Sequence, residues 1–283
     1  MTASLLQLNV ESLTKAKINV LTHLAEAHAV TAILLQETHY KDRSHLKIPG
    51  YTLAACTESE VYGTATFVKH HAKWSAIAVC PENSLLESTA MEVEGVTIIN
   101  VYKPPSIKMD TTGLPYFSRP CMYAGDFNCY STTWGCRSTN ASGEALEDWA
   151  SASGLNLLYD PKQPDSFHSC RWNTGTNPDL AFVNLAGPLP HCTILDPFPK
   201  SQHRPSLIQP INPIKPLTAK PVLRWNFQKA HWEQFTNLTE LGADSLPDPS
   251  SNADMAYSAF CQLLPSSARM SIPRGCRRQY IPT

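Results

Sequence analysis

The chain has 283 residues, of which 42% are hydrophobic and 17% are charged, and its formal net charge is −1 at pH 7. These values are typical of a globular protein with one large core, or one core plus a tail, and they exclude a disordered chain. They also exclude a strongly basic nucleic-acid binder, so any basic face must be local.

The nine cysteines show no Cys-x-x-Cys spacing, and buried free thiols fit them better than a zinc site does. No signal peptide follows Met1, and no apolar run is long enough to span a membrane. We therefore expect an intracellular protein with no membrane partner.

Short apolar runs separated by turns predict about ten strands and a few helices in residues 1–210. The predicted strands are 4–10, 30–38, 64–68, 76–79, 90–93, 96–102, 121–124, 155–159, 179–183, 192–195 and 206–208. Helices are predicted over 13–28 and 143–153, the first with Leu13, Ala16, Val20, Leu21 and Leu24 on one face. Gly95 separates 90–93 from 96–102 and predicts an antiparallel pair. Many short strands with few helices favour two stacked sheets over a parallel doubly wound sheet.

The composition changes after about residue 210. The segment 211–221 is rich in proline and is predicted to be a linker. Beyond it, 228–241 and 253–264 have the pattern of two helices without an evident core of their own. We therefore predict a domain over 1–210 and an extension over 211–283.

The strand at 121–124 ends in Gly125, Asp126 and Asn128. Because residues two apart in an extended chain face the same side, the carboxylate and the amide would leave the strand end together. On its own this pattern also fits an ordinary turn, since Gly, Asp and Asn are frequent turn residues. Several other strand ends carry similar chemistry, and this favours one site over many separate turns. The strand-end residues are Asn9, Glu11, Glu37, Tyr102, Asp126, Asn128, Asp179 and His203.

One group of these residues has the chemistry of a metal site. Oxygens of Glu37, Asn9 and Glu11 are the kind of ligand that Mg²⁺ requires. Such an ion would neutralise a phosphodiester and stabilise its leaving oxygen. The alternative interpretation of each residue alone is a surface turn or a helix cap.

The other group has the chemistry of phosphodiester cleavage. Asp126 could orient and deprotonate the attacking water, with Asn128 and Tyr102 donating hydrogen bonds to phosphate oxygens. Asp179 is the best candidate to fix the tautomer of His203 and to favour its charged form. The resulting imidazolium would stabilise charge that develops on the phosphoryl group.

Five motifs occur in a fixed order, namely Leu8-Asn9-Val10-Glu11, Leu35-Gln36-Glu37-Thr38, the segment 100–105 with Tyr102, Gly125-Asp126-Phe127-Asn128 and Pro178-Asp179-Leu180. They resemble the exonuclease–endonuclease–phosphatase superfamily, which includes abasic-site endonucleases and deoxyribonuclease I. More narrowly, the segments 36–39, 48–51, 134–135 and 223–232 resemble the endonuclease domain of a jockey-type non-LTR (LINE-like) retrotransposon polyprotein, truncated before the reverse transcriptase.

The resemblance implies an α/β (α+β) fold, a deoxyribonuclease-I-like four-layer sandwich of two mixed β-sheets flanked by helices, with a C-terminal helical tail. It implies nicking of DNA that depends on Mg²⁺ or Mn²⁺, with Glu37 as the chief metal ligand beside Asn9 and Glu11. Ser166 and Gln202 are candidate phosphate contacts. In a full-length element, the partners would be a covalently linked reverse transcriptase and the element RNA. The chain would then act in the nucleus on chromosomal DNA.

The sequence departs from the family pattern at two places near the expected site. The usual Ser-Asp-His triplet is Ser201-Gln202-His203 here, so a negative group beside the metal and the histidine is missing. We expect this change to weaken Mg²⁺ binding and to slow cleavage. Cys129 and Tyr130 replace histidines that often follow the Gly-Asp-Phe-Asn motif. In addition, no Asp-Asp pair occurs, so we expect no polymerase activity in this chain.

Three functions are therefore considered. The first is an active or weakened DNA endonuclease, which intact Glu37, Asp126 and His203 favour. The second is an inactive retrotransposon-derived remnant that acts at most as a nucleic-acid-binding module, which Gln202 favours. The third is a phosphomonoesterase on the same scaffold, such as a lipid phosphatase, and the retrotransposon-like segment at 223–232 argues against it.

Overall fold

The computed structural model describes residues 3–59, 61–78, 85–117, 120–185, 187–211 and 224–275. Contacts within the chain define two compact units, 1–215 and 216–283, and the sequence predicts a division after residue 210. The predicted proline-rich linker lies almost entirely outside the described residues.

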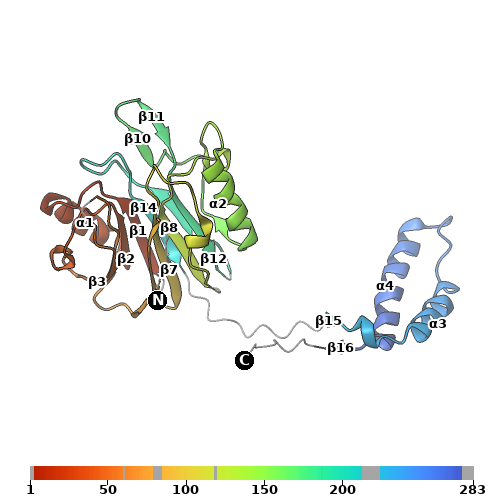
Figure 1. Ribbon diagram of the computed structural model, residues 1–283. Helices are drawn as coiled ribbons and strands as arrows, with labels where there is room; N and C mark the ends of the chain where they lie inside the picture. Colours follow the sequence, from red (N-terminus) through yellow and green to blue (C-terminus); the bar gives the residue numbers. More distant parts are fainter. Residues whose placement is uncertain are drawn as a thin grey trace. The chain divides into compact units, whose positions relative to one another are not determined.

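The first unit contains two six-stranded sheets (Figure 1). The first sheet consists, in spatial order, of β13 (His191–Ile194), β14 (Ser206–Ile211), β1 (Ala3–Asn9), β2 (Ala32–Gln36), β4 (Ala65–Lys69) and β3 (Tyr51–Cys56). The second consists of β5 (Trp74–Ile77), β6 (Glu87–Val93), β7 (Val96–Tyr102), β8 (Cys121–Asp126), β12 (Asp179–Asn184) and β9 (Asn156–Leu157). The β1–β2 and β7–β8 pairs are parallel, and the other neighbouring strands pair antiparallel, so both sheets are mixed.

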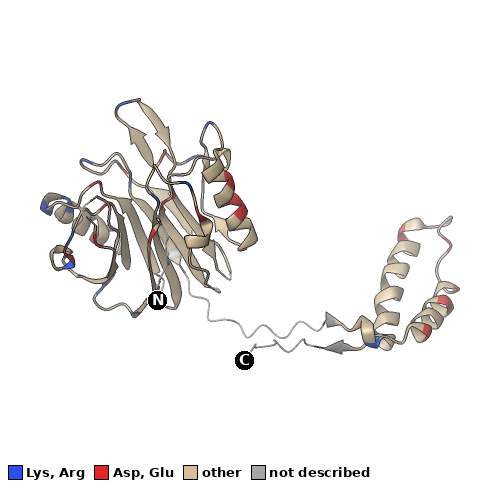
Figure 2. Cartoon of the chain, in the orientation of Figure 1, with Lys and Arg blue, Asp and Glu red and all other residues tan. Residues whose placement is uncertain are grey.

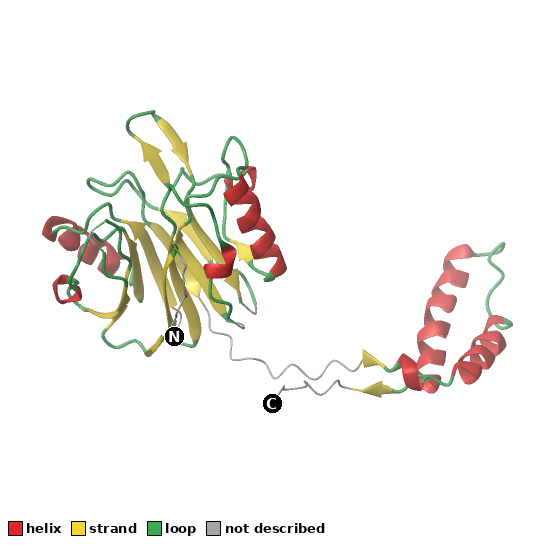
Figure 3. Cartoon of the chain, in the orientation of Figure 1, coloured by secondary structure: helices red, strands yellow, loops and turns green. Residues whose placement is uncertain are grey.

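Helices α1 (Lys15–Ala27) and α2 (Ala141–Ala152) cover the outer faces of the first and second sheets (Figure 3). Short 3₁₀ turns are found at Arg43–His45, Thr111–Gly113 and Thr132–Trp134. Apolar side chains fill the space beneath each helix and between the two sheets, which gives four layers. The predicted sandwich of two mixed sheets flanked by helices is confirmed.

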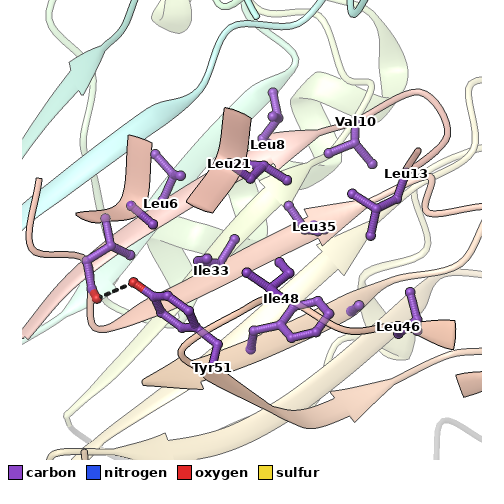
Figure 4. Close-up of a cluster of buried hydrophobic side chains, with 14 of the residues drawn as sticks. Leu6, Leu8, Val10, Leu13, Leu21, Ile33, Leu35, Leu46, Ile48 and Tyr51 are labelled. Carbon is purple, nitrogen blue, oxygen red and sulfur yellow. Dashed lines mark hydrogen bonds between the residues drawn. The ribbon is translucent and has the colours of Figure 1, made fainter. Parts of the chain in front are cut away.

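The cluster beneath α1 shows how the strands build this core (Figure 4). Leu6 and Leu8 of β1 and Ile33 and Leu35 of β2 are all fully buried on the face that α1 covers. The intervening residues of both strands face the second sheet, because successive side chains of a strand point to opposite sides. Both faces of each strand are thus covered, which explains the nearly continuous apolar runs in the sequence.

Helix α1 lies close to its predicted range, and its buried face was predicted in part. Leu13 and Leu21 are buried and Leu24 packs against the core, as predicted, but Ala16 and Val20 are exposed and Lys17 and Ala25 are buried instead. The observed stripe has a spacing of four residues and begins with a lysine, so a search for apolar periodicity alone shifts the face by one position.

Two features were absent from the prediction. Strand β3 lies at an edge of its sheet and is half-buried along most of its length, so it lacks a strong apolar signal. The hairpin of β10 (Phe167–Ser169) and β11 (Thr174–Thr176) has strands of three residues with polar sequences. It projects from the body of the unit (Figure 1).

The second unit contains a helical pair. Helices α3 (Trp232–Ala243) and α4 (Ala253–Ser271) pack against each other, and Gly242 gives Leu263 close access to α3. A 3₁₀ turn, Phe227–Lys229, precedes α3, and short strands β15 (Arg224–Trp225) and β16 (Arg274–Gly275) pair beside the helices. The predicted helix ended at residue 264, before Pro265, because proline usually breaks a helix. Helix α4 instead continues through Pro265 to Ser271. Over the described residues, no helix is both long and apolar enough to cross a membrane.

Candidate active site

The candidate site is the polar end of the interface between the two sheets. In β1, Leu6 and Leu8 face α1, so the alternation turns Leu5, Gln7 and Asn9 toward the second sheet. The same alternation directs Gln36 of β2, Asn100 and Tyr102 of β7, Asp126 of β8 and Asp179 of β12 to this interface. The interface is apolar along most of its length and becomes polar where these strands end or begin.

Strand register aligns the polar residues at that edge. Tyr102 pairs with Asp126, and Asp126 pairs with Asp179, on three neighbouring strands of the second sheet. Asn9 of the first sheet reaches across to Asp126, with its Nδ2 2.9 Å from Oδ2. Gly125 permits this arrangement, because a Cβ at that position would lie 1.8 Å from the Val101 carbonyl oxygen of β7.

His203 lies between two buried aspartates. Its Nδ1 is 2.8 Å from Asp179 Oδ2, and its Nε2 is 3.9 Å from Asp126 Oδ2. Burial lowers the pKa of His203, but the charge and hydrogen bond of Asp179, together with Asp126, outweigh burial and raise it to about 9. Burial also raises the pKa of Asp126, to about 7, against the opposing effect of His203. The imidazole is therefore charged at neutral pH, while Asp126 gains and loses its proton in that range.

Glu37 is held by two donors at the mouth of the site. Asn9 Nδ2 lies 3.0 Å and the Tyr102 hydroxyl 2.8 Å from Glu37 Oε1, and both donate to it. Burial and the charge of Glu37 raise the pKa of Tyr102 far above its ordinary value, so this hydroxyl is a neutral donor. The other carboxylate oxygen, Oε2, lies 3.7 Å from His39 Nε2. No sequence signal placed His39 at the site, because it follows the strand end by three residues.

Unusual backbone conformations are concentrated beside these side chains. Glu11, Glu37, His39 and Asn128 have φ angles of 43°, 51°, 57° and 44°. Non-glycine residues rarely adopt positive φ, and each such residue costs about 1–3 kcal/mol when the conformation is strained. The sharp turns after β1, β2 and β8 turn these side chains toward one another at the edge of the sandwich. Backbone strain of this kind is typical of functional sites.

Lys17 supports the site from α1 and was missed in the sequence. It is 5% exposed, and its Nζ donates to the carbonyl oxygens of Val10, Glu11 and Lys200 at 2.5, 2.9 and 2.9 Å. Burial lowers its pKa, and the charge of Glu11 opposes that effect. The lysine joins the turn after β1 to the turn that carries the histidine. Lys17 is four residues before the buried Leu21 and so lies on the same face of the helix, which is the sequence signal that this lysine is buried.

Ser166 differs from the expectation of a phosphate contact. Its hydroxyl donates to Asp179 Oδ2 at 2.9 Å, and the residue is 1% exposed. The Asn177 side chain accepts from the Ser166 backbone N–H at 2.9 Å and fixes the residue facing inward. In this structure Ser166 supports Asp179 rather than presenting its hydroxyl to solvent.

Gln202 also has contacts that the sequence did not predict. Its backbone N and its Nε2 both donate to Glu11 Oε1, at 3.3 Å each, and its Oε1 accepts from the Cys170 backbone N–H at 3.1 Å. The carboxamide thus contacts an acid beside the site as a donor, which an aspartate could not do. Asn128, in turn, donates from Nδ2 to the Lys103 carbonyl oxygen at 3.0 Å and has a second N–H available.

The donor set fits a hard divalent cation held through few protein ligands. Glu37 and Glu11 would supply carboxylates and Asn9 an amide oxygen, its Oδ1 also accepting from the Glu11 backbone N–H at 3.0 Å, and these are ligand types suited to Mg²⁺. Among the described residues, no group of three or more His, Cys, Asp or Glu side chains has the arrangement of a metal-binding cluster. Mg²⁺ usually takes one or two carboxylates together with water and substrate phosphate, so a smaller set is adequate.

The first unit has the fold of nucleases of known structure, a sandwich of two mixed sheets flanked by helices, as the sequence resemblance implied. A sequence profile described as "Endonuclease-reverse transcriptase" matches residues 96–207. No curated protein matches the chain.

Three solved structures illustrate the similarity. The endonuclease domain of TRAS1, a telomere-specific non-LTR retrotransposon, is 16% identical with a TM-score of 0.56, over 75% of this chain and 100% of that one. The AP endonuclease LMAP from Leishmania major is 17% identical with a TM-score of 0.55, over 75% and 88% of the two chains. The 3′-5′ exonuclease NExo from Neisseria meningitidis is 17% identical with a TM-score of 0.55, over 74% and 100%. These likenesses establish the fold, and the jockey-type assignment stays a prediction.

Proposed function

We propose that this protein is an endonuclease that uses a divalent cation, Mg²⁺ or Mn²⁺, to nick DNA phosphodiester bonds. The observation that carries the proposal is the convergence of Glu37, Asp126, Asp179 and His203 at one edge of the sandwich. They come from four separate parts of the sequence. Asn9 Nδ2 donates to both Glu37 and Asp126, and His203 lies 2.8 Å from Asp179 and 3.9 Å from Asp126.

Asp126 and His203 perform the proton and charge chemistry in this proposal. Asp126 orients the attacking water and accepts its proton, with Asn9 fixing Oδ2 of the carboxylate. The His203 imidazolium, held through Nδ1 by Asp179, presents Nε2 to charge that develops on the phosphoryl oxygens. The second N–H of Asn128 would contact another phosphate oxygen.

Glu37, with Asn9 and Glu11, would hold the cation. The ion would supply neutralisation of the phosphodiester and stabilisation of the leaving oxygen. Tyr102 and Asn9 both donate to Oε1 of Glu37, so Oε2, which lies 3.7 Å from His39 Nε2, would be the oxygen free to hold a cation. Lys17 and Gln202 fix Glu11 through its carbonyl and its carboxylate.

The β10–β11 hairpin favours a polymeric substrate over a small phosphate ester. His168 N donates to the Gln202 carbonyl oxygen at 2.9 Å, so the hairpin is anchored to the turn that carries His203. At its tip Trp172 is 67% exposed, with the Arg171 guanidinium 4.8 Å from its ring centroid. Lys and Arg positions occur at this tip and on neighbouring loops (Figure 2). An exposed aromatic ring beside a cation suits contacts with bases and phosphates.

We further propose the role that the retrotransposon resemblance implies. The nick would provide the 3′-hydroxyl primer for reverse transcription in the nucleus. A covalently linked reverse transcriptase and the element RNA would be its partners, and the extension over 211–283 would lead toward that enzyme. The second candidate function, a weakened or inactive remnant that only binds nucleic acid, is favoured by the carboxamide of Gln202 in place of a negative group.

Conversion of supercoiled plasmid to the open-circular form tests the proposal. The natural chain is assayed with Mg²⁺ and with EDTA, beside Glu37→Gln and the matched control Glu144→Gln, which alters an exposed acid on α2. We expect nicking with Mg²⁺ that EDTA abolishes, a loss of about 10²-fold or more in Glu37→Gln, and natural activity in Glu144→Gln.

Two outcomes would contradict the proposal of an active DNA endonuclease, and a third would reject the site. DNA binding without nicking would favour the remnant. Release of inorganic phosphate from small monoesters without nicking would favour the phosphomonoesterase. Equal activity in Glu37→Gln and the natural chain would reject this site as the nuclease centre.

A further inference from the structure

Three buried carboxamides lie between the sheets behind the Asp179–His203 pair. Gln7, Gln36 and Asn100 are 1%, 0% and 0% exposed, and we call them the amide network. Gln7 Nε2 donates to Asp179 Oδ1 at 2.8 Å and to Gln36 Oε1 at 2.9 Å. Gln36 Nε2 donates to Asn100 Oδ1 at 2.6 Å. The network begins on β7 of the second sheet, crosses to β2 and β1 of the first, and returns to β12 of the second.

The orientation of each amide is determined from the far end of the network. Asn100 Nδ2 donates to the carbonyl oxygens of Leu35 and Ala65, at 3.1 and 3.2 Å. A carbonyl oxygen only accepts hydrogen bonds, so Asn100 must turn its Oδ1 toward Gln36. Gln36 then presents its NH₂ to Asn100 and its oxygen to Gln7. Both hydrogens of the Gln7 amide are thereby committed, one to Gln36 and one to the aspartate.

We propose that the amide network is a positioning device for the site, which delivers an N–H donor to Asp179 Oδ1 and so holds this carboxylate in a fixed position against His203. The other oxygen, Oδ2, accepts from the Ser166 hydroxyl and lies 2.8 Å from His203 Nδ1. Both oxygens of Asp179 accept from these donors, which assigns Nδ1 as a further donor and leaves Nε2 as the atom presented to the reaction. The catalytic role of this arrangement rests on the proposed function, whereas its geometry is independent of that function.

The network acts on the aspartate without touching the histidine. Asp179, Asp126 and Glu11 are the charges that influence His203, and the Phe167 ring lies 4.8 Å from the imidazole. Replacing Gln7 changes none of these groups. It removes one donor from the buried carboxylate, which then interacts more strongly with His203 and raises the pKa of the imidazole.

Histidine NMR titration of Gln7→Met tests the proposal. Methionine has a similar length and no donor, so Asp179 Oδ1 loses its partner in this variant. Because this hydrogen bond is lost, we expect the titration midpoint of His203 to rise from about pH 9 to about pH 10 or higher. His203→Gln assigns the signal. Ser4→Ala is the matched control, because Ser4 is also on β1, is 7% exposed and donates to the Ala29 carbonyl oxygen outside the network.

Kinetics provide a second measurement. In the plasmid assay, Gln7→Met is expected to lower kcat at pH 8 with little change in KM, because Asp179 and His203 act in the transition state. Should Gln7→Met fail to fold, Gln7→Asn replaces it. That variant keeps an amide but is too short to reach both partners, and the same upward shift is expected.

An unchanged His203 midpoint in the Gln7 variants would overturn the proposal, as would an equal shift in Ser4→Ala. If the natural chain does not nick DNA, the proposed function fails, while the titration still decides whether the network positions Asp179 and His203.

Discussion

Asp179→Asn is the most informative single change, because it removes a charge while preserving the shape of the side chain. The natural His203 pKa of about 9 depends on Asp179, against burial that lowers it. Without the aspartate we expect the pKa of His203 to fall to its ordinary value of 6.5 or below. At pH 8 the protonated fraction would drop from about nine-tenths to roughly one-thirtieth. Nicking at pH 8 should therefore fall by about 30-fold or more, with a further loss if the introduced carboxamide donates to Nδ1 and reverses the tautomer.

The pH profile gives the same prediction a sharper form. Activity needs Asp126 deprotonated, above about pH 7, and His203 protonated, below about pH 9, so the natural chain should show a bell-shaped profile between these values. In Asp179→Asn the pKa of His203 falls below that of Asp126. At no pH are most molecules then both protonated at His203 and deprotonated at Asp126, so no pH restores the rate. A simple shift of the pH optimum would restore it.

The stability of the same variant provides an independent check. The folded-state pKa of His203 is above its unfolded value, so the pair stabilises the fold fully below about pH 6.5, and this stabilisation is lost as the pH rises through about 9. The difference corresponds to on the order of 3 kcal/mol. Urea denaturation should show Asp179→Asn destabilised at pH 6 and much less so at pH 10. An equal loss at both pH values, or nicking at pH 8 within about threefold of natural, would refute the reasoning.

Three other substitutions test separate parts of the structure. Lys17→Met leaves three carbonyl oxygens without their donor and should lower the free energy of unfolding by about 2 kcal/mol or more. The rate of Mg²⁺-dependent nicking should fall as well. Lys15→Met, at an exposed position of the same helix, should change neither quantity. Gly125→Ala should prevent folding or lower the free energy of unfolding by more than about 3 kcal/mol, because the new Cβ would meet the Val101 backbone. Gly50→Ala is the control, since Gly50 has open space around it and the substitution should cost only about 1–2 kcal/mol for the positive φ. Thermal unfolding measures both variants. Gln202→Asp should lower the Mg²⁺ concentration needed for half-maximal nicking, because it adds a carboxylate beside Glu11; no gain in Mg²⁺ affinity would reject our explanation of that departure.

The sequence predicted the parts of the site that end an apolar run. Glu37 and Asp126 each follow a buried strand, so a change from apolar to acidic residues marks their positions directly. Strand pairing then brings those strand ends to one edge. The order of the motifs indicates that the ends belong to one site but does not give the distances between them. The Asp179–His203 contact was predicted from chemistry alone, since a buried imidazole requires a partner.

The supporting residues were invisible because they are polar positions inside otherwise apolar elements. The bond from Gln7 to Asp179 joins residues 172 positions apart, and the bond from Gln36 to Asn100 joins residues 64 apart. Nothing local distinguishes such a glutamine from an exposed residue of an edge strand. The position of Ser166 was equally hidden, because the short hairpin that follows it has too few residues to leave a strand pattern.

The central claim is that Glu37 and His203 work as one unit on a phosphodiester, and a double-variant cycle tests it most directly. Single-turnover nicking rates are measured for the natural chain, Glu37→Gln, His203→Gln and the double variant. Residues that act in one transition state lose their effects together, so we predict that the double variant is about as slow as the slower single variant. Losses that multiply would show two independent contributions and would contradict a single active site.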